Sequence, residues 1–334
     1  MIAFGPVPSR RLGHSLGINN IQPKTCSYSC VYCQVGRTLR KQVERRPFFR
    51  PEGMVADVNS KLDKIRPRNE PVDYLTFVPD GEPTLDSEIG REIELVRLTG
   101  IKVAVITNGS LMGRDDVRAE LMRADWVSVK VDSVTERTWR RVNRPHRSLQ
   151  LERMLDGMQR FARDFSGTLV TETMLVKGFN DTEESVGAVG EFLARLRPAV
   201  TYLAIPIRPP AEKRGQPPGE ETVNRAYQLL LGKVDRLEYL IGYEGNAFAS
   251  TGDAEDDLLS IAAVHPMRRD AVQSLLAKSG AGWQIVDGLI SRGEIVEVEH
   301  GGSRFYLRRF LGSGPTRGNH PTAPGRRRCS GNGD

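Results

Sequence analysis

Three of the chain's four cysteines stand close together, in the segment TCSYSCVYCQ at residues 25–34. Thiolates with the spacing Cys26-x3-Cys30-x2-Cys33 can converge on one metal centre. A [4Fe–4S] cluster has four irons, so three cysteine ligands leave one iron open to another molecule. The cysteine spacing therefore indicates a cluster with an open position.

Two other readings of the cysteines fit less well. Structural zinc takes four ligands, and catalytic zinc usually includes histidine or carboxylate. The nearest histidine is His14, and the fourth cysteine, Cys329, lies far away in the tail. A thioredoxin-like redox pair would use Cys30 and Cys33 and would leave Cys26 without a role.

The composition is that of an ordinary globular protein of 334 residues, with 39% hydrophobic and 27% charged residues. No apolar run is long enough for a transmembrane helix, and the N-terminus lacks the layout of a secretory signal. We therefore expect a cytoplasmic protein without a membrane partner. In that reducing compartment, clustered cysteines indicate metal binding or catalysis rather than disulfides.

The net charge of +6 is unevenly distributed. Basic residues crowd the segment Arg37–Arg50, recur at Arg304, Arg308 and Arg309, and form the triplet Arg326–Arg328. Such segments either track phosphates or form a solvated face, and the sequence leaves both readings open.

From about residue 70, short β-branched runs alternate with segments of helical periodicity such as SEIGREIELVRL and ESVGAVGEFLARL. This alternation predicts βα units around a parallel sheet, either an open barrel or a doubly wound sheet. The predicted strands are a first one near His14–Asn19, then Tyr74–Val78, Lys102–Thr107, Trp126–Asp132, Gly167–Val176 and Tyr202–Ile207.

A Pro-rich charged segment, Ile207–Glu221, ends this rhythm, and a helical pattern then runs to about Tyr239. The section that follows predicts three short helices and a hairpin of strands Ile295–Glu299 and Arg304–Arg308, the pattern of a winged helix. We expect a core domain at residues 1–215, a connecting helix and linker at 216–250, a winged-helix-like domain at 251–311 and a disordered basic tail at 312–334.

The cysteine motif, with the aromatic Tyr32 immediately before Cys33, resembles the signature of the radical S-adenosylmethionine (SAM) superfamily. The resemblance covers about residues 4–215. It implies an α/β fold with a partial (βα)6 TIM-like barrel, a [4Fe–4S] cluster held by Cys26, Cys30 and Cys33, and SAM on the open iron. In that family, an electron from the cluster cleaves SAM to a 5′-deoxyadenosyl radical that abstracts hydrogen from the substrate.

Two further motifs follow successive predicted strands, at the ends where barrel enzymes gather their sites. Asp80-Gly81-Glu82-Pro83 resembles the family's Gly-Gly-Glu-Pro motif, whose backbone receives the SAM amino group; aspartate replaces the usual first glycine. Thr107-Asn108-Gly109 is similar to the family's Thr-Asn-Gly motif. The resemblance implies that Gly81, Glu82, Pro83, Thr107 and Asn108 contact the cofactor.

Later strand ends carry the remaining expected contacts. The resemblance implies that Lys130 pairs with the SAM carboxylate and that Asp132 or Ser133 accepts hydrogen bonds from the ribose, although Lys130 and Asp132 could merely flank the sheet edge. Glu172 lies inside an apolar strand, where a carboxylate is costly unless paired. A structural ion pair and a substrate contact are both open for it. Pro206, Arg208 and Pro209 lie at the end of the sixth strand, where related enzymes cradle the adenine.

The N-terminal region resembles a little-characterised group of Fe–S oxidoreductases near the wybutosine-type tRNA-modifying enzymes. Those relatives hold a second cluster on upstream cysteines, and none precedes Cys26 here. Arg10 and Arg11 would reach an anionic ligand or remain on the surface.

Three functions remain open at this stage. The first is a radical SAM enzyme that abstracts hydrogen from RNA or another macromolecule. The second is a peptide- or protein-directed radical enzyme, including a glycyl-radical activase. The third is a redox-sensing DNA-binding regulator, which would leave the SAM positions without use. Either enzyme needs an electron donor such as ferredoxin or flavodoxin.

Overall fold

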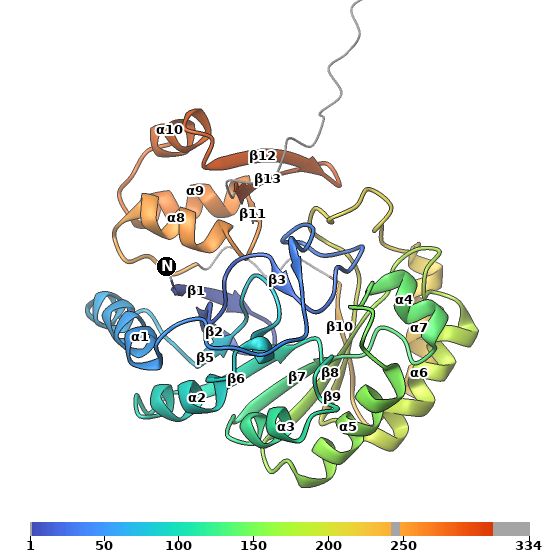
Figure 1. Ribbon diagram of the computed structural model, residues 1–334. Helices are drawn as coiled ribbons and strands as arrows, with labels where there is room; N and C mark the ends of the chain where they lie inside the picture. Colours follow the sequence, from blue (N-terminus) through green and yellow to red (C-terminus); the bar gives the residue numbers. More distant parts are fainter. Residues whose placement is uncertain (1, 242–247, 310–334) are drawn as a thin grey trace, which may run out of the picture.

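The structure, a computed structural model, describes residues 2–241 and 248–309. Eight strands form one curved sheet in the order β1-β2-β5-β6-β7-β8-β9-β10 (Figure 1). Their bounds are β1 Ala3–Ser9, β2 Gly13–Ile18, β5 Tyr74–Phe77, β6 Lys102–Thr107, β7 Trp126–Lys130, β8 Thr168–Met174, β9 Val200–Ala204 and β10 Leu237–Leu240.

All neighbouring strands from β2 to β10 pair in parallel, and only β1 runs antiparallel to its neighbour. Helices connect the parallel strands and cover the outer face of the sheet, as crossover connections require (Figure 1). They are α1 Pro51–Ile65, α2 Ile89–Arg97, α3 Asp115–Leu121, α4 Glu136–Val142, α5 Leu151–Asp164, α6 Glu183–Leu196 and α7 Glu220–Leu231, with the short 3-10 turns η1 Arg66–Arg68 and η2 Pro83–Leu85.

Alternation along each strand separates an apolar outer face from a partly polar inner face. In β5, Leu75 and Phe77 belong to the main hydrophobic core beneath the helices, whereas the Thr76 hydroxyl bonds to Ser15 on β2 at 2.6 Å. The fold is thus α/β, with a curled half-barrel sheet that has room for polar side chains inside it.

The cysteine segment leaves the sheet after β2 and forms a loop above its carboxyl edge. Two short strands, β3 (Thr25–Cys26) and β4 (Arg40–Lys41), pair with each other and bring the two ends of this loop together. We call residues 25–41 the cluster loop.

All six predicted barrel strands are present, which confirms the βα rhythm. Two further strands of this eight-stranded sheet, β1 and β10, were not predicted. β1 contains one glycine and two prolines, which disfavour a strand except at an edge, where this strand lies. The helix expected to run to about Tyr239 ends at Leu231, and β10 follows it. The sheet therefore extends beyond residue 215.

The C-terminal unit has its own hydrophobic core and a three-stranded sheet in the order β11-β13-β12. The three predicted helices and the predicted hairpin are present, and the hairpin turn is made by two glycines with positive φ. The elements are α8 Ala254–Ala262, β11 Met267–Arg268, α9 Arg269–Lys278, α10 Gln284–Ser291, β12 Ile295–His300 and β13 Ser303–Arg308.

This unit packs against the start of the barrel, beside β1 and α1 (Figure 1). The buried ammonium group of Lys61 on α1 lies 3.0 Å from the Asp257 carboxylate on α8. The backbone amide of Ala249 donates to the carbonyl oxygen of Pro6 on β1 at 3.0 Å. The two units therefore share a polar interface as well as chain continuity.

In the described parts of the chain, no helix is both long and apolar enough to span a membrane. The tail predicted at residues 312–334, with Cys329, lies outside the described residues.

Candidate functional site

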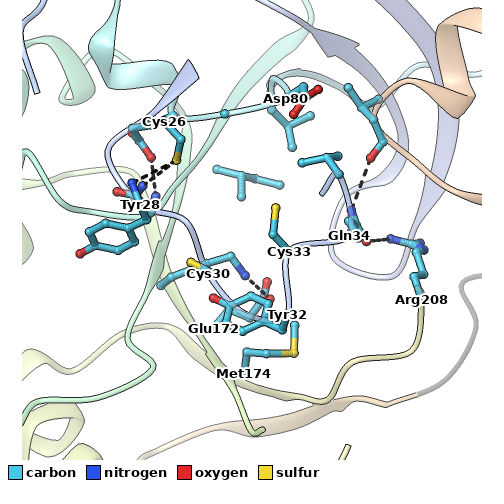
Figure 2. Close-up of a pocket in the computed structure, with 18 of the residues that line it drawn as sticks. Cys26, Tyr28, Cys30, Tyr32, Cys33, Gln34, Asp80, Glu172, Met174 and Arg208 are labelled. Atoms are coloured by element: carbon cyan, nitrogen blue, oxygen red, sulfur yellow. Dashed lines mark hydrogen bonds and ion pairs between the residues drawn. The ribbon is translucent and has the colours of Figure 1, made fainter. Parts of the chain in front are cut away.

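A cavity of about 270 Å³ opens at the carboxyl ends of the parallel strands, beneath the cluster loop. Cys26, Cys30 and Cys33 all line it, so the structure brings the three predicted ligands to one place. Figure 2 shows them around the hollow, with Asp80 and Glu172 on its walls.

Burial raises the pKa of all three thiols, and that of Cys30 to about 12. Two amide side chains point at the sulfurs: Asn108 Nδ2 lies 3.6 Å from Cys26 Sγ, and Asn143 Nδ2 lies 3.4 Å from Cys30 Sγ. Such N–H groups stabilise a thiolate sulfur that binds a metal, and hydrogen bonds of this kind tune cluster potentials.

The donor set suits a cluster better than a single ion. No group of three or more His, Cys, Asp or Glu side chains among the described residues could hold one metal ion. An iron–sulfur cube offers separate iron corners, so its three thiolates need not meet at one atom. Three sulfurs spaced around one cavity fit that requirement.

Gly81 brings the turn after β5 against the cluster loop. A Cβ atom at this position would lie 1.8 Å from the carbonyl oxygen of Thr25, and the backbone φ is +153°. The amide of Glu82 donates to that same carbonyl oxygen at 3.1 Å. The glycine is thus required by a close backbone approach directly before Cys26.

The Glu82 carboxylate joins two of the predicted motifs. Its Oε1 accepts from the Thr107 hydroxyl at 2.5 Å and from the Thr84 hydroxyl at 2.6 Å. Its Oε2 accepts from the Asn108 amide at 2.8 Å. With these partners, the side chain connects the two strand ends, and the residue lines the cavity.

Asp80, which replaces the family's first glycine, is buried on the cavity wall. Its carboxylate lies 3.1 Å from the Lys24 ammonium group, its backbone amide donates to Asn19 Oδ1 at 3.0 Å, and burial raises its pKa to about 6. Aspartate at this position therefore adds a charged pair beside the cluster loop.

Strand register places Lys130 directly beside Glu172 on the inner face of the sheet. Lys130 Nζ lies 2.6 Å from Glu172 Oε1, and Arg11 Nη1 lies 2.6 Å from Glu172 Oε2. Burial alone would raise the pKa of Glu172, but Lys130 and Arg11 lower it to about 2. Glu172 is thus an ionised partner of two cations, and Arg11 belongs to the cavity rather than the surface.

The Tyr32 hydroxyl donates to the Asp132 carboxylate, which also accepts from Asn143 Nδ2 at 2.6 Å. Asp132 does not line the cavity and acts through Tyr32, which does. Ser133 and Pro83 also lie off the cavity wall, and the Ser133 hydroxyl accepts from the Thr135 amide at 3.1 Å. Asp132 and Ser133 are thus not among the residues that line the cavity, and their contact with the SAM ribose stays a prediction.

Pro206 lines the cavity after β9, as does Arg208 beyond it. Arg208 Nη1 donates to Gln34 Oε1 at 2.7 Å, and Gln34 Nε2 donates to the Val264 carbonyl oxygen at 3.4 Å. Arg208 Nη2 lies 3.0 Å from Nε2 of His265. We call this set of contacts the latch, since it joins the cluster loop, the β9 end and the C-terminal unit.

Because arginine keeps its proton, His265 Nε2 must be the acceptor, and its ring proton stands on Nδ1. Burial and the neighbouring Arg208 lower the pKa of His265 well below its ordinary value, which agrees with a neutral ring.

Arg208 was named from the sequence together with Pro206, and it lines the cavity. Asn143, Gln34 and His265 were not predicted to belong to the site. Gln34 stands next to Cys33, so its position alone offered a signal. His265 comes from a different structural unit, and no local pattern marks it.

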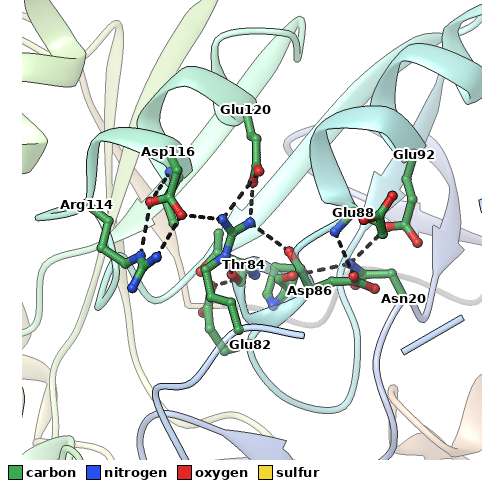
Figure 3. A network of polar contacts seen from close by, with 12 residues as sticks. Asn20, Glu82, Thr84, Asp86, Glu88, Glu92, Arg114, Asp116 and Glu120 are labelled. Atoms are coloured by element: carbon green, nitrogen blue, oxygen red, sulfur yellow. Dashed lines mark hydrogen bonds and ion pairs between the residues drawn. The ribbon is translucent and has the colours of Figure 1, made fainter. Parts of the chain in front are cut away.

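Only some of the basic side chains in the segment Arg37–Arg50 are exposed to solvent. Arg45 has a side chain that is 6% exposed and pairs with Asp116 and Glu120. It also donates to the carbonyl oxygen of Asp86 at 2.8 Å. Figure 3 shows this network, which extends to Glu92 and Asn20. Arg45 therefore cannot contact a phosphate without giving up its ion pairs with Asp116 and Glu120.

The sequence profile described as the Radical SAM superfamily matches residues 22–188, half of the chain. UPF0026 protein MJ1312 of Methanocaldococcus jannaschii is 46% identical over 310 residues, which cover 92% of this chain and 96% of that protein. UPF0026 protein slr1464 of Synechocystis is 37% identical over 62% of this chain and 76% of its own length.

Among solved structures, a radical SAM methyltransferase from Sphaerobacter thermophilus aligns with a TM-score of 0.53 at 16% sequence identity. The alignment covers 68% of this chain and 66% of that one. At this identity the likeness concerns the fold.

Proposed function

Because the chain belongs to the radical SAM superfamily, whose enzymes use a [4Fe–4S] cluster and SAM, we propose that the cavity beneath the cluster loop holds both groups. Cys26, Cys30 and Cys33 bind three irons of the cluster, and SAM occupies the remaining cavity. The observation that carries this proposal is that the cysteines, the turn at Asp80–Glu82 and Lys130 all line one cavity.

When bound, the cluster and SAM supply the electron transfer and the 5′-deoxyadenosyl radical that abstracts hydrogen from the substrate. The residues of the chain bind and orient them. The backbone of Gly81 and Glu82 would receive the SAM amino group, Lys130 would pair with its carboxylate, and Pro206 would contact the adenine. Tyr32, held by Asp132, closes the wall beside the cluster loop.

Charge on the inner face supports this assignment. Lys130 and Arg11 both pair with the carboxylate of Glu172, so two cations stand on the cavity wall where the SAM carboxylate would lie. The side chains of Met174 and Ile205 supply apolar walls. A cavity with apolar walls excludes water, which strengthens these charge interactions and protects a radical from side reactions.

The substrate in this proposal is RNA or another macromolecular anion, and the enzyme works in the cytoplasm with a donor such as ferredoxin or flavodoxin. The C-terminal unit, in the order α8-β11-α9-α10-β12-β13 with sheet order β11-β13-β12, has the element order of a winged helix, and we assign it to substrate docking.

The test is anaerobic reconstitution with iron and sulfide, followed by measurement of bound iron and of 5′-deoxyadenosine formed from SAM with dithionite. Alanine at Cys26, Cys30 or Cys33 should abolish both the visible absorbance and SAM cleavage. The matched control is Cys329→Ala, which removes the fourth cysteine and should leave both unchanged. Bleaching in the Cys329→Ala protein, or cleavage that survives loss of Cys30, would contradict the three-ligand proposal.

A further inference from the structure

Four arginines from three distant segments meet beside the cluster loop. Arg37 belongs to that loop, Arg141 and Arg144 stand at and just after the end of α4, and Arg214 follows β9. We call these residues the arginine cluster. Three of them share one carboxylate, that of Glu212.

Glu212 cannot neutralise this group. Arg37 Nη2 lies 3.3 Å from Glu212 Oε1, and Arg214 Nε lies 3.0 Å from Oε2. Arg144 approaches both oxygens, with Nη2 2.8 Å from Oε2. The hydrogen bond from Arg144 and that from Arg214 lower the pKa of Glu212 to about 2, so one negative charge faces three fixed positive charges.

An aromatic ring lies within the same surface. The guanidinium carbon of Arg141 lies 5.4 Å from the centre of the Phe179 ring, and that of Arg214 lies 5.6 Å from it. Arg37 is 72% exposed and Arg214 is 65% exposed, so their guanidinium groups are accessible. Flat guanidinium groups around an aromatic side chain form a surface on which bases can stack.

The arginine cluster lies beside the proposed active site. The amide of Glu212 donates to the carbonyl oxygen of Val31, between two of the cysteines, at 3.2 Å. Gly36, the neighbour of Arg37, lines the cavity itself. A polymer held at the arginine cluster would therefore run past the cavity.

We propose that the arginine cluster binds the phosphate backbone of an RNA substrate next to the cavity. Arginine pairs with phosphate through two parallel N–H donors, and an excess of positive charge attracts a chain with one charge per nucleotide. An acidic peptide would supply carboxylates but no bases for the Phe179 surface. The inference rests on the proposed function, since the bound RNA is the molecule from which hydrogen is abstracted.

The test uses the reconstituted full-length protein and a fluorescein-labelled 20-nucleotide RNA of mixed sequence. Fluorescence anisotropy gives Kd at a series of NaCl concentrations. The triple variant R37Q, R141Q and R214Q leaves Arg144 paired with Glu212, so no buried carboxylate is orphaned. The slope of log K against log salt is negative, and the loss of three phosphate contacts should make it shallower by about 2 to 3.

The control variant removes the same charge elsewhere. R91Q, R160Q and R225Q change arginines in exposed ion pairs on α2, α5 and α7, and should keep the wild-type slope. Equal slopes for the two triple variants would overturn the inference. A second result would also overturn it. If poly-L-glutamate bound as tightly as the RNA and lost affinity in the R37Q, R141Q and R214Q variant, the partner would be an acidic polypeptide.

Turnover is not needed for these curves. Wild-type protein that cleaves no SAM would contradict the proposed function, and the binding data would still decide for or against the arginine cluster.

Discussion

At the level of single residues, burial controls the ionisation of the three cysteines that line the cavity. Ionisation of Cys26, Cys30 and Cys33 is unfavourable on its own, because burial raises the pKa of each thiol. A bound metal reverses this preference, so binding releases protons and the thiolates gain the amide donors of Asn108 and Asn143. Metal uptake should therefore be stronger at higher pH within the stable range.

A second buried pair lies behind the Glu82 turn. Asp86 and Glu92 are fully buried, and Asn20 Nδ2 donates to Glu92 Oε2 at 3.2 Å. Burial raises the pKa of both carboxyl groups, and the charge of Asp86 raises that of Glu92 further. The folded protein thus keeps protons that the unfolded chain releases as pH rises.

This difference predicts the pH dependence of stability. Above pH 4.5, the ordinary pKa of glutamate, the folded state binds more protons at this pair than the unfolded state. The free energy of unfolding should thus fall with rising pH, by about 1.4 kcal/mol per pH unit for each proton retained.

Glu92→Gln replaces the acid by a permanently neutral amide of the same shape. Urea unfolding between about pH 5 and pH 9 should show a shallower decline in the variant than in the wild type. Gln at exposed Glu94 on the same helix is the control and should keep the wild-type slope. Parallel curves for all three proteins would show that Glu92 ionises normally in the fold.

At the level of elements, the site depends on how closely two backbones approach. The turn after β5 touches the cluster loop through Gly81 and the Thr25 carbonyl oxygen, and no side chain fits between them. The loop's own short pairing, β3 with β4, then fixes where the first cysteine stands. One glycine therefore connects the sheet to the proposed cluster ligands.

Gly81→Ala tests this contact. The new methyl group must displace the cluster loop, so we expect reconstitution to bind less than half of the wild-type iron, while far-UV circular dichroism stays that of a folded protein. Gly187→Ala is the control, because no atom lies within 4 Å of a Cβ in that α6 position. It should raise stability by about 1 kcal/mol and bind iron normally. Full iron content in Gly81→Ala would refute the argument.

At the level of the whole molecule, the C-terminal unit contributes to the cavity wall. Val264 lines the cavity, and the latch connects His265 through Arg208 to Gln34 beside Cys33. The unit is also held at α1 through Lys61 and Asp257. Loss of the latch should thus change the cavity without releasing the unit.

We expect His265→Leu, which removes the acceptor but keeps the bulk, to raise the KM for SAM in 5′-deoxyadenosine formation about 10-fold, roughly 1.4 kcal/mol. His265→Gln supplies an oxygen acceptor for Arg208 and should restore most of the affinity. Lys278→Gln, which breaks an exposed docking pair with Glu70, is the control.

Hydrogen–deuterium exchange of residues 205–216 provides a second measurement. Suppose that His265→Leu speeds exchange of these residues but leaves the KM for SAM unchanged. The latch would then only hold the C-terminal unit in place, and His265 would not position Arg208 for the cofactor.

Much of this protein follows from local sequence patterns. The cysteine spacing, the six strands and the positions after their carboxyl ends were all predictable, because parallel strands place successive strand ends at one edge. Cys26, Cys30, Cys33, Gly81, Glu82, Thr107, Asn108, Lys130, Glu172, Tyr32 and Pro206 all reach the cavity wall.

Tertiary structure alone decided the roles of side chains whose partners are distant in the chain. Glu172 became an ion-pair partner because strand register set it beside Lys130 and Arg11 reached it from another strand end. Asp132 accepts a hydrogen bond from the Tyr32 hydroxyl. The latch and the arginine cluster each join several segments. Sequence periodicity reports which face a residue occupies, but contacts across elements depend on register, crossing and docking, which no local pattern encodes.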